Sequence, residues 1–113
     1  MNKAQLLLKE NKKYLMNTGK IITIATDLWL VPKDQRRFYP NGLKFGWIAF
    51  NDDNPDERIL VDYNPKKGFH YHLDEKPIVK LKWVSLENAQ KLFAKMVQEK
   101  FGEFIKEIER HEK

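Results

Sequence analysis

The chain has 113 residues, a length typical of one domain with one hydrophobic core. Its 21 basic and 16 acidic residues give a net charge of +5, which permits binding to a polyanion such as RNA without requiring it. The lack of cysteine excludes disulfides and thiolate metal sites, and the apolar runs are far shorter than the ~20 residues of a transmembrane helix. We therefore expect one cytoplasmic domain over residues 1–113, monomeric or homodimeric, without a membrane partner.

The N-terminal segment, residues 2–17, is predicted to form a short helix. Its alanine and leucines fall roughly on one helical face, with lysines on the other. Gly19 follows as a helix stop, because glycine tolerates the left-handed conformation that comes after a last helical turn.

The middle of the chain has the composition of an antiparallel sheet. Stretches rich in β-branched and aromatic residues are separated by turn residues, and one face of the last stretch is polar. The predicted strands are 21–31, 43–50, 58–63 and 78–84, and the histidine-containing segment before residue 78 is expected to pair as one more. Residues 33–42 are predicted to form a polar loop.

A long amphipathic helix is predicted from Ser85 to Ile108. Ser85 is a suitable N-cap, and apolar residues then recur at steps of three and four. Gly102 lies inside this stripe and suggests close packing at that point. The predicted fold class is therefore α+β: an antiparallel sheet of four to five strands flanked by an N-terminal helix and this C-terminal helix.

The candidate site is the segment from Pro65 to Pro77, which contains two of the three histidines. His70 and His72 are spaced i, i+2, so on an extended backbone both imidazoles point to one face. Lysines precede the pair, and Asp74 falls on the same side if the strand continues. The third histidine, His111, is expected to be solvated.

Metal-free RNA cleavage is the first chemistry that this segment suggests. One imidazole removes the proton of the ribose 2′-OH and the other protonates the leaving 5′-oxygen. Asp62 or Asp74 would accept an imidazole N–H and fix its tautomer. The cations that would offset charge on the phosphate are Lys66, Lys67 and Arg58.

Two other interpretations stay open. Two histidines with Asp74 or Glu75 also form a two-His, one-carboxylate metal set, and both histidines could be ordinary half-exposed strand residues. A second basic and aromatic patch, from Arg36 to Tyr39, has the composition of a single-stranded RNA contact or of a loop folded back on the sheet.

The run from Asp62 to His72 resembles the middle of TumE-type toxins, small proteins of prokaryotic toxin–antitoxin pairs. Such toxins place an aspartate at a strand end, then a glycine-containing turn and a histidine pair, then a strand and an amphipathic helix. The matching positions here are Asp62, Gly68, His70 and His72. The resemblance covers about the C-terminal half of the chain, and it implies an antitoxin partner and an action on RNA.

The sequence thus predicts a toxin-like protein, with metal-independent ribonuclease activity as the expected chemistry and no cofactor. His70, His72 and Asp62 are the candidate catalytic residues. The candidate substrate-binding residues are Arg58, Lys66, Lys67, Gly68 and Asp74. The alternative is a non-catalytic module that binds RNA or a protein through the same basic surface.

Overall fold

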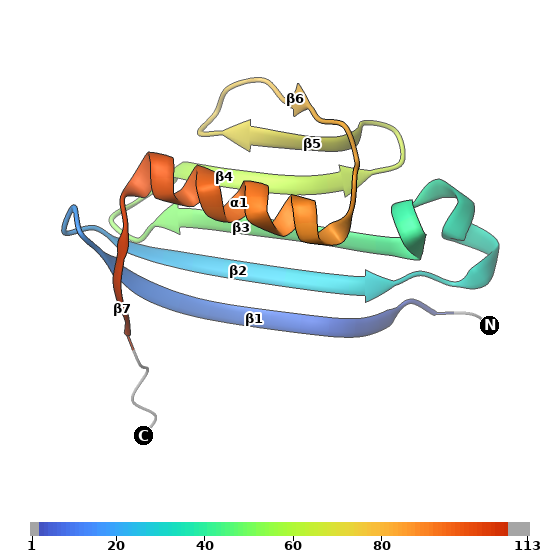
Figure 1. Cartoon of the computed structure of the whole chain (residues 1–113), viewed down its shortest axis with the longest axis horizontal. Coiled ribbons are helices and arrows are strands. Elements are labelled where there is room, and N and C mark those ends of the chain that lie inside the picture. The colour runs from blue at the N-terminus through green and yellow to red at the C-terminus, as the bar shows by residue number, and fades with distance from the viewer. Residues whose placement is uncertain (1–2, 109–113) are drawn as a thin grey trace.

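A computed structural model describes residues 3–108 and is dominated by one seven-stranded antiparallel sheet (Figure 1). The strand order is β6-β5-β4-β3-β2-β1-β7, so the first six strands form a meander and the last strand returns beside the first. The strands are β1 (Gln5–Met16), β2 (Ile21–Leu30), β3 (Leu43–Asn51), β4 (Asn54–Asn64), β5 (Gly68–Leu73), β6 (Val79–Lys80) and β7 (Phe104–Ile108). One α-helix, α1 (Leu86–Phe101), lies across one face of this sheet (Figure 1).

The core lies between α1 and the sheet. Alternate residues of β3, from Phe45 to Ala49, are buried on the helix side, as the period of two in a strand requires. The buried face of α1 meets them, and the rings of Trp47 and Phe93 lie 5.9 Å apart. Each large apolar side chain buried in this way contributes roughly 1.5–3 kcal/mol. The sheet face opposite α1, which we call the rear face, carries the other half of each strand.

The predicted N-terminal helix is wrong, because residues 5–16 form strand β1. This strand pairs with β2 along its length, from Gln5 opposite Leu30 to Leu15 opposite Ile21. Most of its side chains are exposed, so it has no buried helical stripe, and the long ladder outweighs local helix propensity. Gly19 has the expected positive φ of 87°, but in the turn that joins β1 to β2.

The predicted C-terminal helix is too long. It begins as expected, with Ser85 Oγ accepting the N–H of Asn88, but it ends at Phe101. Gly102 then adopts φ 93°, and residues 104–108 form β7 against the end of β1. Phe104 packs edge-on against Tyr14 at 4.9 Å and is therefore part of the sheet rather than of a helical stripe.

The remaining predicted segments are largely strands, with two differences. Only Val79 and Lys80 of the segment 78–84 form a strand against β5. The Leu81 N–H adds one hydrogen bond to the Phe69 carbonyl at 2.8 Å, and Trp83 packs on the ring of Phe69 at 5.3 Å. The loop before β3 contains two 3₁₀ helices, Lys33–Phe38 and Pro40–Gly42. The predicted fold of four to five strands and two helices is thus replaced by seven strands and one α-helix over residues 3–108.

No helix within residues 3–108 is both long and apolar enough to cross a membrane. His111, expected to be solvated, lies outside the described residues.

Candidate functional site

The two histidines of β5 lie together on the rear face. Phe69 and Tyr71, which alternate with them, pack on the helix side of the sheet. The rings of His70 and His72 are 5.2 Å apart between centroids and meet edge to face at 76°. The pair therefore places two imidazoles close enough to act on neighbouring atoms of one ligand.

His70 is held by its own hairpin. The turn between β4 and β5 ends at Gly68, whose φ of 72° favours glycine. The carbonyl oxygen of Gly68 lies 2.8 Å from Nδ1 of His70. A carbonyl only accepts hydrogen bonds, so Nδ1 carries the proton and Nε2 is the nitrogen free to exchange one. The His70 side chain is only 2% exposed, which fixes its orientation and restricts access to it.

His72 is the more accessible ring, because it is half-buried. Burial lowers the pKa of His72 below 6.5, and the nearby His70 and Lys67 lower this pKa further. The ring is therefore mainly neutral at pH 7, as a general base must be.

Asp62 lies on β4 directly opposite His70. Burial raises the pKa of the Asp62 carboxyl above 3.8, while His70 is the main group that opposes this shift. The nearby carboxylate of Asp27 raises the pKa of Asp62 further. A half-buried carboxyl with a raised pKa next to an imidazole is a common feature of sites that move protons.

Asp27 and Gly46 belong to the same site and were not predicted from the sequence. Gly46 lies on β3 between the two carboxylates, with Asp27 as its partner on β2 and Asp62 as its partner on β4. A Cβ at position 46 would lie 3.7 Å from an oxygen of each carboxylate, and the Gly46 N–H donates to Asp27 Oδ1 at 3.1 Å. The missing side chain leaves a hollow in the rear face between β1 and β4, lined by Asp27, Ile48 and Leu60 among others.

These residues form one continuous row across the sheet. Successive cross-strand partners from β1 to β6 are Lys9, Asp27, Gly46, Asp62, His70 and Lys80. The row has a cation at each end and two carboxyls and an imidazole at its centre. Only the strand register reveals it, because its members are spread over more than 70 residues of sequence.

The predicted substrate-binding residues do not all lie in one place. The positive charges of Lys67 and Arg58 both lower the pKa of His72, and Arg58 lies two residues before Leu60, the cross-strand partner of His72. Lys66 lies in the exposed hairpin turn, where its N–H donates to Asn64 Oδ1 at 2.8 Å. Asp74 lies away from the histidines: the strand ends at Leu73, and the Asp74 carboxylate pairs with Lys100 of α1 at 2.8 Å.

The second basic patch, from Arg36 to Tyr39, is anchored at two points and is otherwise exposed. Arg36 Nε donates to the carbonyl of Val31 at 3.0 Å, and the ring of Tyr39 packs on Tyr63 at 5.5 Å. Phe38 stays 47% exposed beneath the guanidinium of Arg37, which lies 4.7 Å from the ring centroid. Tyr39 therefore folds back on the sheet, whereas Arg36, Arg37 and Phe38 stay exposed.

Within residues 3–108, no group of three or more histidine, aspartate or glutamate side chains is arranged to hold a metal ion. Comparisons with protein-family models, curated proteins and solved structures find no match to this chain.

Proposed function

We propose that the chain is the toxin-like component of a toxin–antitoxin pair and cleaves RNA without a metal ion. The toxin-like role rests on the resemblance of the segment from Asp62 to His72 to TumE-type toxins. The observation that carries the chemistry is the His70–His72 pair, with ring centroids 5.2 Å apart and Asp62 opposite His70 on the next strand.

The two imidazoles have different environments, which suits different roles. His72 is half-buried and has a lowered pKa, so it is the base that accepts the 2′-OH proton. The 2′-oxygen then attacks the phosphorus, and the bond to the 5′-oxygen breaks. His70 delivers a proton from Nε2 to that leaving oxygen, while its Nδ1–H stays bonded to Gly68. The Asp62 carboxylate offsets the positive charge on the His70 ring before this transfer.

The cations near His72 suit the phosphate. Lys67 approaches from the hairpin turn and Arg58 from the neighbouring strand β4, and both act on the charge of His72. Lys66 adds a third positive charge in the turn. Cations on both sides of the base would hold the phosphate and stabilise the charge that develops during attack.

A non-catalytic module that binds RNA or a protein is the second candidate. The 2% exposure of His70 favours it, because that ring reaches a substrate only if the neighbouring side chains move. In this case the lysines and Arg58 would contact the ligand and the histidines would stabilise the sheet.

Cleavage of labelled RNA in EDTA separates the two candidates. The variants are His72→Gln and His70→Asn, and the control is Lys44→Ala. Asparagine is chosen at position 70 because its amide can still donate to the Gly68 carbonyl. Each lost proton transfer should slow cleavage by about 10²–10⁴-fold. Binding without cleavage by the wild type supports the module, and cleavage that needs added metal contradicts the proposed mechanism. Near-UV circular dichroism checks that each variant is folded.

A further inference from the structure

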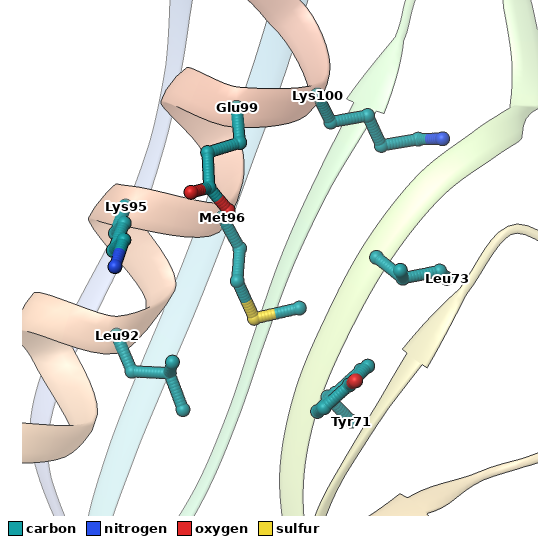
Figure 2. A pocket seen from close by; sticks show the side chains of 7 residues that line it. All are labelled: Tyr71, Leu73, Leu92, Lys95, Met96, Glu99 and Lys100. Atoms are coloured by element: carbon teal, nitrogen blue, oxygen red, sulfur yellow. The ribbon is translucent and has the colours of Figure 1, made fainter.

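A groove runs along the helix side of the sheet between α1 and β5, on the opposite face from the histidines. Two adjoining hollows of about 410 and 340 Å³ form it, and both are lined by Leu92 and Lys95. Figure 2 shows the larger hollow, in which Met96 extends from α1 toward Tyr71 and Leu73 of β5.

The floor of this groove is apolar and only partly covered. In the larger hollow it is formed by half-buried side chains of α1 and β5: Tyr71, Leu73, Leu92 and Met96. In the smaller hollow Phe69 and Leu81 continue it. These residues pack on the edge of the core, yet α1 covers them from one side only, because it lies over β3 and β4 (Figure 1).

The rim of the groove is basic. The residues that line the two hollows include four lysines and one carboxylate: Lys82, Lys91, Lys95, Lys100 and Glu99. Lys100 pairs with Asp74 at 2.8 Å, and Lys91 pairs with Glu87 at 3.3 Å. Lys82 and Lys95 form no ion pair with another residue of the described range 3–108. Glu99 likewise forms no ion pair within this range, so two unpaired lysines against one unpaired carboxylate leave a net positive charge next to the apolar floor.

We propose that this groove binds a short amphipathic helix of a protein partner, apolar on one face and acidic along its edges. The apolar face would cover the floor around Met96, and the carboxylates would meet Lys82 and Lys95. This inference rests on the part of the proposed function that gives the chain a protein partner, and it adds where that partner binds.

A helix fits better than an extended strand. Tyr71 on the groove floor is already paired in the ladders with β4 and β6, so the middle of β5 offers no backbone edge to a new strand. The occupant must satisfy its own backbone, as a helix does. From Asn88 to Lys100, α1 is about 18 Å long at 1.5 Å per residue, which matches a partner helix of about three turns.

RNA is less well matched to this groove than to the rear face. Single-stranded RNA is held by cations together with aromatic rings on which bases stack. The exposed floor here is mainly aliphatic, and Tyr71 is its only half-buried aromatic ring among the residues that line the hollows.

The test is selection of displayed random 16-residue peptides on the full chain, followed by affinity measurements on the enriched peptides. Fluorescence anisotropy would compare the wild type with Lys82→Glu/Lys95→Glu, with Met96→Gln, and with the charge-matched control Lys44→Glu/Lys106→Glu. Each double variant replaces two lysines with glutamate, so the change in net charge is the same. All four lysines are exposed, so neither variant buries a charge. The same proteins are assayed for cleavage and binding of labelled RNA.

Enriched peptides should be acidic and amphipathic and should gain helical circular dichroism on binding. Either groove variant should weaken binding by about tenfold or more, and the control by less than about threefold. The proposal would be overturned if no peptides were enriched, or if the enriched peptides lacked this pattern or bound the groove variants equally well. It would also be overturned if Lys82→Glu/Lys95→Glu lost RNA binding rather than peptide binding. Peptide binding to the groove by a chain that does not cleave RNA would refute the ribonuclease alone.

Discussion

Asp62 and His70 are direct cross-strand partners on β4 and β5, and burial raises the pKa of this carboxyl while the histidine opposes the shift. The carboxylate also favours the protonated form of His72, which lies two residues further along β5. The half-buried carboxyl of Asp62 is thus coupled to both imidazoles. This coupling leads to two predictions for the same substitution.

Asp62→Asn should lower the pKa of His72. Asp62 is the group that raises this pKa against the effects of burial, His70 and Lys67, so removal of its charge leaves only groups that lower it. NMR titration of the His72 ring would measure the change. Asp27→Asn is the comparison, because Asp27 contributes to the pKa of Asp62 but is absent from the causes that act on His72. An unchanged or raised pKa of His72 in Asp62→Asn would contradict the coupling.

Asp62→Asn should also change how stability depends on pH. A carboxyl whose pKa is raised in the folded state is most favourable when protonated, so its contribution is present below 3.8 and is lost as pH rises through the folded pKa. At pH 7 the wild type therefore bears an unfavourable buried charge, and Asp62→Asn should be the more stable protein. Urea unfolding at pH 7 and at pH 4 would show this gain shrinking at the lower pH. A loss of stability at pH 7 would indicate a stabilising partner for the carboxylate.

Asp74→Asn should have the opposite dependence on pH. The hydrogen bond from Lys100 is the main cause that holds the pKa of Asp74 below 3.8. The stabilisation is then present above 3.8 and is lost as pH falls through the folded pKa. We expect a cost of about 0.5–1 kcal/mol at pH 7, because the pair is partly exposed, and a smaller cost at pH 3.

The same variant tests the predicted role of Asp74 in substrate binding. The carboxylate faces α1 rather than the histidines, so RNA binding and cleavage should be unchanged in Asp74→Asn. A fall in RNA affinity with unchanged stability would show that the residue contacts the ligand.

The local parts of this fold are predictable from the sequence, and the parts that depend on distant pairing are not. The strands from β2 to β5 follow one another along the chain, joined by turns or by one loop. The alternation of apolar and polar residues gives their positions to within a few residues. β1 and β7 hydrogen-bond to each other across about 90 residues of sequence. Lys13 and Ile108 carry no local signal of that pairing, and the apolar residues after Gly102 continue a helical stripe by coincidence.

The candidate site was predictable in the same partial way. His70 and His72 are two residues apart in sequence and share a face wherever the chain is extended, so the sequence was enough to predict the pair. Asp27 and Gly46 join it only through the register of three strands. The groove on the other face depends on where α1 crosses the sheet, which no sequence pattern specifies.

Gly102→Ala should be strongly destabilising, because two costs coincide there. The residue has φ 93°, and a Cβ would collide with Asn17 Oδ1 and would lie 2.9 Å from Thr18 Cγ2. Asn17 cannot move away freely, since its side chain accepts the N–H of Glu103 at 3.0 Å and its own N–H donates to the Glu103 carbonyl at 2.8 Å. We expect a loss of about 2 kcal/mol or more.

Gly19→Ala is the matched control for this substitution. Gly19 has a similar φ of 87°, but nothing lies within 4 Å of the added Cβ. Only the backbone strain remains, so the cost should be about 1 kcal/mol. Urea unfolding of both variants gives the difference, which measures how tightly the end of α1 is held against the turn between β1 and β2. Equal costs would mean that this turn moves aside easily, and that the glycine at position 102 is favoured by its backbone conformation alone.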